Sequence, residues 1–157
     1  MIPPRATADS PNALAGYLGM SSALARGSLP ASTRERIALA AAPINGCDYC
    51  LSAHSYLSKN SAKLDEAEIA ANRHDRSCDS KADAAVRFPV KTARERDHVS
   101  DSDLQAVHMA GCDDAQIAAP RLVTHGQRNI GTAVKTPPAA TLYCVEISPT
   151  ETPCRTF

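Results

Sequence analysis

The feature that most constrains the fold is a succession of helix-length segments from residue 10 to about residue 119, almost without strand-like alternation. Start and stop signals bound several of these segments. Ser10 followed by Pro11 combines a capping oxygen with a proline suited to the first turn, and Gly27 suits the end of that helix. The expected helices cover residues 10–27, 32–42, 48–59, 65–73, 81–96, 100–109 and 113–119. The sequence therefore predicts an all-α domain over residues 1–119, with Pro89 as a kink inside one helix.

Residues 120–157 differ from the rest of the chain. They contain five of the eleven prolines and two of the seven glycines, and they show no sustained apolar period. Residues 140–148 could form a strand, but a lone strand would have no partner in this sequence. We therefore expect an irregular or disordered C-terminal tail after the helical domain.

The charge and hydropathy of the chain exclude several classes of function. Seventeen basic residues balance seventeen acidic ones, whereas a general nucleic-acid binder needs a surplus of Lys and Arg. The first twenty residues contain no continuous apolar stretch of signal-peptide length, and no window elsewhere approaches the roughly 20 apolar residues of a membrane span. We therefore expect a cytoplasmic protein that binds neither nucleic acid nor membrane. In that compartment its six cysteines are expected to be catalytic, metal-binding or free, not a structural disulfide framework.

Two of the six cysteines stand close together as Cys47-x-x-Cys50, and His54 follows four residues later. Pro43 and Gly46 interrupt the preceding helical pattern, so the pair is expected to open a new helix. The N-terminus of a helix stabilises a thiolate, and the three-residue spacing allows the two sulfurs to react with each other. One helical turn after Cys50, the His54 imidazole could accept the thiol proton. The motif predicts a redox-active site.

Other interpretations compete with a redox pair. The two cysteines could be buried free thiols, and His54 by itself could be a half-buried structural residue. A structural zinc site needs four ligands, of which the motif supplies three and Cys78 or Cys112 could supply the fourth. A c-type haem site requires a histidine directly after the second cysteine, where Leu51 stands. Zinc binding therefore stays open as an alternative.

Glu35 precedes Cys47 by twelve residues and has two interpretations. As the fourth residue of Ser32-x-x-Glu35 it matches a capping box, which would add about 1 kcal/mol to helix stability. Its carboxylate could instead take part in proton transfer at the cysteine pair. The local pattern by itself favours the cap. Tyr49, between the two cysteines, is expected to be a packed or surface tyrosine.

The stretch from residue 32 to residue 69 reads STRERIALAAAPINGCDYCLSAHSYLSKNSAKLDEAEI. It resembles the alkylhydroperoxidase D-like branch of the carboxymuconolactone decarboxylase family, in particular the members described as peroxidase-related enzymes. The diagnostic pattern is a glutamate, then Cys-x-x-Cys-x-x-x-His beginning twelve positions later. It is matched here by Glu35, Cys47, Cys50 and His54. The likeness extends from about residue 10 to about residue 118.

The resemblance implies an alkylhydroperoxidase D-like helical fold, assembly into trimers or larger rings, and thiol peroxidase activity without a metal or organic cofactor. In such enzymes the second cysteine attacks the peroxide, so Cys50 would become a sulfenic acid and Cys47 would resolve it as a disulfide. Glu35 and His54 would form the proton relay that generates the Cys50 thiolate. A small-molecule dithiol or a lipoylated protein would then reduce the pair. The alternative of another class is a non-catalytic redox-sensing module, or a remnant that retains the motif.

Overall fold

The computed structural model describes residues 11–96, 98–119 and 123, and it confirms the all-α prediction. Its helices are α2 (Pro11–Ala25), α3 (Ala31–Ile44), α4 (Asp48–Asn60), α5 (Glu66–Arg73), α6 (Ser80–Arg94) and α7 (Asp101–Met109). Residues 114–119 are also helical, and no strand occurs within the described ranges. The predictions for the tail after residue 119 fall almost entirely outside these ranges. None of the described helices is long and apolar enough to cross a membrane.

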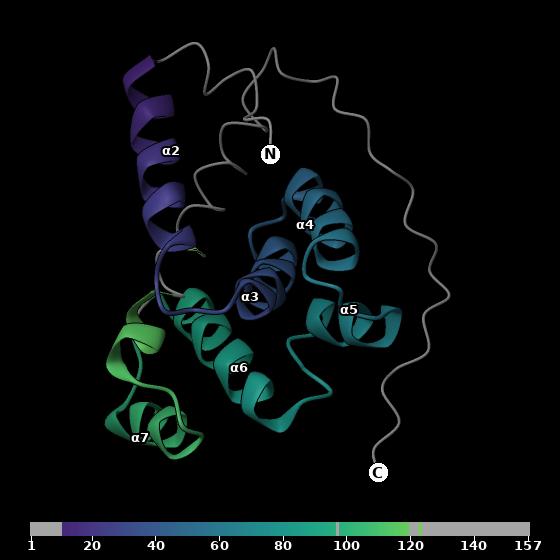
Figure 1. Cartoon of the computed structure of the whole chain (residues 1–157). Helices are drawn as coiled ribbons and strands as arrows, with labels where there is room; N and C mark the ends of the chain where they lie inside the picture. The colour runs from purple at the N-terminus through teal and green to yellow at the C-terminus, as the bar shows by residue number, and fades with distance from the viewer. Residues whose placement is uncertain (1–10, 97, 120–122, 124–157) are drawn as a thin grey trace.

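Helix α3 forms the centre of the molecule and contacts α4, α5 and α6 (Figure 1). Six consecutive α3 residues, 37–42, are buried, and four of them are alanines. A helix that is covered on several sides must be apolar around its axis, and alanine side chains let neighbouring helices approach closely. Ile69 of α5 and Val86 of α6 add two further fully buried side chains to this core. The alanine-rich segment thus determines where α4, which carries the cysteine motif, packs.

Several helices begin close to the expected residues, and side-chain caps mark two of these starts. Asp65 caps α5 by accepting a hydrogen bond from the amide three residues later, and Ser100 forms a complete capping box at the start of α7. The helices at the two prolines differ in how they agree with the prediction: α3 ends two residues later than expected, and α6 contains Pro89 as expected. Helix α3 continues past Pro43 and ends at Ile44, and α6 runs through Pro89, which is buried in the core.

The predicted capping box at Ser32 is wrong. Helix α3 begins at Ala31, its N-cap residue is Pro30, and no side chain caps it. Ser32 therefore lies inside the first turn, where the backbone is already helical and the capping geometry is lost. The Glu35 carboxylate contacts a side chain of α4 instead. The Glu35 carboxylate, which the local pattern had assigned to the cap, thus binds His54 of another helix.

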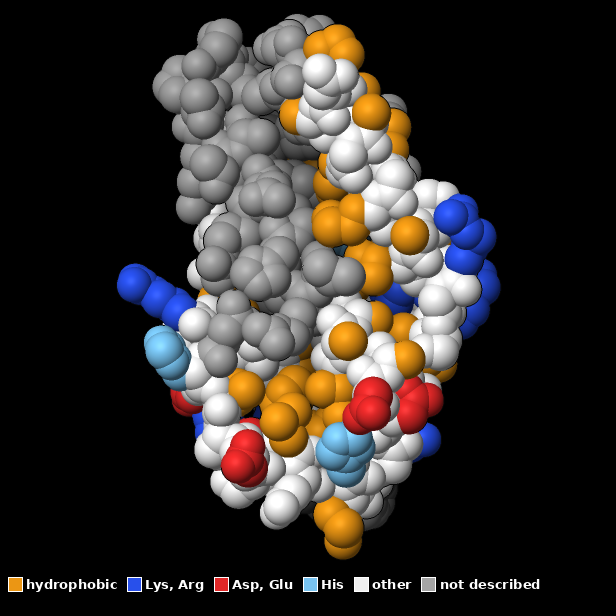
Figure 2. Space-filling view, turned by 90° about the vertical axis from the view of Figure 1, so that its left-hand side faces the viewer, with side chains coloured by type: hydrophobic (Ala, Val, Ile, Leu, Met, Phe, Trp, Pro, Cys, Tyr) orange, Lys and Arg blue, Asp and Glu red, His pale blue; other side chains and the backbone are white. Residues whose placement is uncertain are grey.

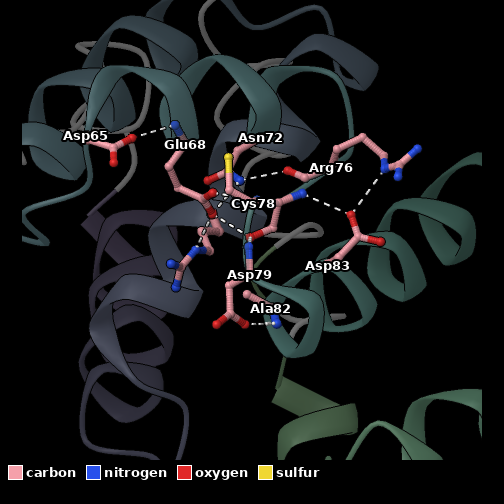
Figure 3. Close-up of polar contacts among 10 residues, drawn as sticks. Asp65, Glu68, Asn72, Arg76, Cys78, Asp79, Ala82 and Asp83 are labelled. Carbon is pink, nitrogen blue, oxygen red and sulfur yellow. Dashed lines mark hydrogen bonds and ion pairs between the residues drawn. The ribbon is translucent and has the colours of Figure 1, made fainter. Parts of the chain in front are cut away.

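A buried carboxylate ties α5 to α3 and to the loop before α6. The Glu68 side chain, 7% exposed, accepts hydrogen bonds from Arg36 Nε (2.6 Å), Ser77 Oγ (2.5 Å), the Cys78 amide (2.7 Å) and Asn72 Nδ2 (3.1 Å). Figure 3 shows Glu68 among these groups, with Asn72 and Cys78 labelled. Burial acts to raise the pKa of Glu68, but the hydrogen bonds outweigh burial and lower this pKa below the usual value. The fold therefore stabilises the ionised form of the Glu68 carboxyl group.

We expect Glu68→Ala to lower the free energy of unfolding by about 3 kcal/mol, because it leaves the Arg36 guanidinium and other buried donors without an acceptor. Since the folded-state pKa is lowered, this stabilisation is present above the pKa of the unfolded chain and is lost as the pH falls through the folded-state pKa. The difference in the free energy of unfolding between wild type and Glu68→Ala should therefore become smaller as the pH falls from about 7 to about 2, as measured by chemical denaturation. Glu66→Ala, which removes an exposed ion pair with Lys59, is the matched control and should change stability little. Equal losses in the two variants would contradict the expectation.

Candidate functional site

Cys47 and Cys50 lie at the start of α4 and are joined by a disulfide, with their Cα atoms 5.2 Å apart. Cys47 is the N-cap residue of α4, and its Sγ accepts a hydrogen bond from the Cys50 amide at 3.2 Å. Gly46 precedes the pair with φ of 56°, a left-handed conformation that glycine adopts without the steric cost of a Cβ. This turn puts the first sulfur at the positive end of the α4 dipole. The structure thus places the predicted pair at disulfide distance and at a helix start.

Both cysteines are buried, with 3% of Cys47 and 2% of Cys50 exposed. Together with Ala42 they form an apolar cluster, against which Tyr17, Tyr49 and Leu51 pack. Tyr49 is therefore packed, as one of its two interpretations expected. Tyr17 belongs to α2 and was missed by the sequence analysis. No local pattern could have identified it, because thirty residues separate it from Cys47 and only the tertiary fold brings the two together.

Glu35 and His54 meet across the contact between α3 and α4. Nδ1 of His54 lies 2.7 Å from Oε2 of Glu35, and the two side chains are 12% and 18% exposed, respectively. Because Nδ1 contacts Glu35, Nε2 is the ring nitrogen left to exchange a proton with another group. A carboxylate in this position orients the imidazole and fixes which ring nitrogen faces it. His54 follows Cys50 by one turn of α4, so the Glu35–His54 pair and the cysteine pair share one region of the fold.

The other described cysteines do not join this site. Cys112 is a buried free thiol in a separate cluster with Phe88 and Val107. Cys78 is disulfide-bonded, which departs from the expectation that the cysteines outside the motif are catalytic, metal-binding or free. Among the residues that the structure describes, no group of three or more His, Cys, Asp and Glu is arranged to hold a metal ion. Neither candidate for the fourth zinc ligand is therefore gathered with the cysteine motif.

The fold and the site together define a class: a helical protein with a buried, disulfide-forming Cys-x-x-Cys pair beside a Glu–His pair. Residues 11–89 match the family model described as the carboxymuconolactone decarboxylase family. Because that match spans half of the 157 residues, the chain belongs to this family. Membership confirms the resemblance predicted from the motif and supports an enzyme in general. No curated protein sequence matches the chain.

The fold is also similar to a solved crystal structure, that of an uncharacterized peroxidase-related protein from Silicibacter sp. TM1040. The TM-score is 0.70 at 21% sequence identity, and the match covers 78% of this chain. The chain spans 66% of the length of that protein. At this identity the similarity supports the helical fold.

Proposed function

We propose that this protein is a thiol-dependent peroxidase that reduces hydroperoxides through Cys47 and Cys50. The observation that carries the proposal is a disulfide-forming cysteine pair at a helix start with the Glu35–His54 pair one turn away. A thiol peroxidase needs a thiolate nucleophile, a base that generates it and a second thiol that resolves the oxidised sulfur. The four side chains supply these groups. Family membership and the fold of a peroxidase-related protein support the same class.

In the proposed cycle, His54 is oriented by Glu35 and accepts the proton of the Cys50 thiol through Nε2. The Cys50 thiolate attacks one peroxide oxygen, so that an S–O bond forms and the O–O bond breaks. The leaving alkoxide takes the proton from His54 and departs as the alcohol. The Cys47 sulfur then attacks the Cys50 sulfenic acid: the S–S bond forms, the S–O bond breaks, and the departing hydroxide takes the proton of the Cys47 thiol and leaves as water. Two thiols are oxidised for each hydroperoxide that is reduced.

The position of Cys47 fits the resolving role. As the N-cap residue of α4 it receives the hydrogen bond from the Cys50 amide and lies at the positive end of the helix. Both features stabilise a thiolate. The thiol that forms the more stable thiolate is also the better leaving group when a reductant opens a disulfide. We therefore expect the reductant to attack the Cys50 sulfur and to release Cys47 first.

The cycle needs an external reductant, because the disulfide has no nucleophile for a second hydroperoxide. A small-molecule dithiol or a lipoylated protein would donate two electrons by thiol–disulfide exchange and would itself become a disulfide. These steps call for no resident metal or organic cofactor. The proposal also includes a reducing, cytoplasmic setting and a homo-oligomer, a trimer or a multiple of it, as the family resemblance implies.

Steady-state turnover separates this proposal from a non-catalytic redox module. With dihydrolipoamide in excess, we expect an organic hydroperoxide to be consumed at a rate proportional to the protein, with one alcohol formed per dithiol oxidised. Cys112→Ser, which changes the buried free thiol outside the site, is the matched control and should keep the full rate. Consumption no faster than the reaction of dithiol and hydroperoxide without protein would favour the non-catalytic alternative.

A further inference from the structure

The sulfur atoms of the site are not accessible in the structure. Cys50 is 2% exposed and Cys47 is 3% exposed, so neither a hydroperoxide nor a dithiol can touch them while the covering groups stay in place. A displacement at sulfur requires direct, aligned approach of the incoming atom. Exposure of the sulfurs must therefore precede any reaction with them. The residues that cover the cysteine pair then decide which molecules can reach it.

The described side chains packed on the pair differ in how firmly their helices are held. Tyr49 and Leu51 lie on α4, which packs against α3 and α5. Tyr17 lies on α2, which has no buried residue along its whole length. Leu14, Met20 and Leu24 of α2 are half-buried, like Tyr17, but none of its side chains is fully buried. Such a helix gains less from tertiary packing than α4, so moving it costs less free energy. Helix α2 is thus the part of the cover that opens most easily.

The setting of α2 agrees with this role. The helix lies at the edge of the molecule (Figure 1), and Figure 2 shows hydrophobic side chains gathered along it. Its fifteen residues, PNALAGYLGMSSALA, include no charged side chain. Tyr17 is half-buried where α2 meets the cysteine pair, whereas its neighbour Leu18 is 47% exposed. Tyr17 is therefore the residue of α2 that packs against the cysteine pair.

The two tyrosines also lie close to each other. Burial raises the pKa of Tyr49, and the nearby Tyr17 raises it further. One phenol stands on the firmly packed α4 and the other on the weakly packed α2. When α2 moves, Tyr17 leaves while Tyr49 and Leu51 stay.

We propose that Tyr17 determines access to the Cys47–Cys50 pair: its ring covers the sulfurs, and displacement of α2 admits the molecule that reacts with them. The size of this ring sets how large a reactant can enter. For hydroperoxides the inference rests on the proposed function. For other reagents that react with thiols, the inference does not depend on peroxidase activity. It can therefore be tested separately from the proposed function.

The test measures alkylation of the reduced pair, which requires no peroxidase activity. Protein with Cys47 and Cys50 reduced is treated with iodoacetamide or with the bulkier N-phenylmaleimide, and modification is followed by mass spectrometry. We expect Tyr17→Ala to raise the rate about tenfold or more, with the larger increase for the bulkier reagent, and Tyr17→Trp to slow it. Tyr17→Phe keeps the ring and should stay within about twofold of wild type. Rates are compared at a pH where the thiols are fully ionised, so that a change in thiol pKa cannot produce the difference.

Leu18→Ala is the matched control, because it shortens an exposed side chain on the same helix. Its alkylation rate should equal that of wild type. Equal rates in wild type, Tyr17→Ala and Tyr17→Trp would overturn the inference, and so would a similar acceleration in Leu18→Ala. If the Tyr17 variants change the alkylation rate as expected while the wild type reduces no hydroperoxide, control of access is supported and the proposed peroxidase function fails.

Discussion

Replacing Cys50 with Ser should abolish the reaction with hydroperoxide, because the attacking thiolate is gone. Replacing Cys47 with Ser should leave one rapid oxidation per protein but stop turnover, since Cys50 then stays a sulfenic acid or is oxidised further. Both substitutions keep nearly the same side-chain volume in the buried cluster, so the fold around the site should be preserved. Rapid-quench measurement of the alcohol formed by each pre-reduced variant checks both expectations.

The two serine variants assign the two roles independently. The proposed cycle predicts a burst of one alcohol per protein from Cys47→Ser and no burst from Cys50→Ser. If Cys50→Ser gave the burst and Cys47→Ser did not, Cys47 would be the attacking residue and the roles would be reversed.

Glu35→Gln should slow hydroperoxide reduction by roughly two orders of magnitude near neutral pH while the protein stays folded. The glutamine amide has the size of the carboxyl group and can still contact Nδ1 of His54, but it carries no charge to stabilise the imidazolium. His54→Ala should slow the reaction by at least as much, because the base itself is removed. In both variants the loss should shrink as the pH rises past the pKa of the Cys50 thiol, since hydroxide then removes the proton.

Rate–pH profiles and thermal unfolding of the same preparations test this expectation. A cap role for Glu35 offers no explanation for a loss of rate, because α3 already begins before Ser32 and has no side-chain cap. Glu66→Gln, on the exposed face of α5, is a matched control that should keep normal turnover. Normal turnover of Glu35→Gln at neutral pH would remove Glu35 from the relay.

The sequence predicted those parts of the fold and site whose signals are local. The cysteine spacing, with Gly46 before it, predicted a pair at the start of a new helix, and α4 begins at Asp48 with Cys47 as its N-cap. The i, i+4 relation of Cys50 and His54 follows from helix geometry. The expected helices at 65–73 and 100–109 match α5 and α7, whose starts are capped by Asp65 and Ser100 through contacts between neighbouring residues.

What the sequence did not predict depends on contacts between distant segments. The approach of Tyr17 to the cysteine pair and the hydrogen bonds that Glu68 receives from Arg36 and Cys78 join residues on different elements. The failure at Ser32 has the same origin. Its pattern satisfied a local rule, but the Glu35 carboxylate that would complete the cap is engaged by His54 nineteen positions away.

The central claim is that Cys47 and Cys50 form the pair that reduces the hydroperoxide, and a thiol count after one turnover tests it most directly. Protein with the pair reduced is mixed with one equivalent of organic hydroperoxide, the remaining thiols are counted, and the new disulfide is located by mass spectrometry. The account predicts one alcohol formed, two thiols lost, a new disulfide between Cys47 and Cys50, and an unmodified Cys112. Thiol loss at Cys112 or elsewhere, with Cys47 and Cys50 still reduced, would contradict it.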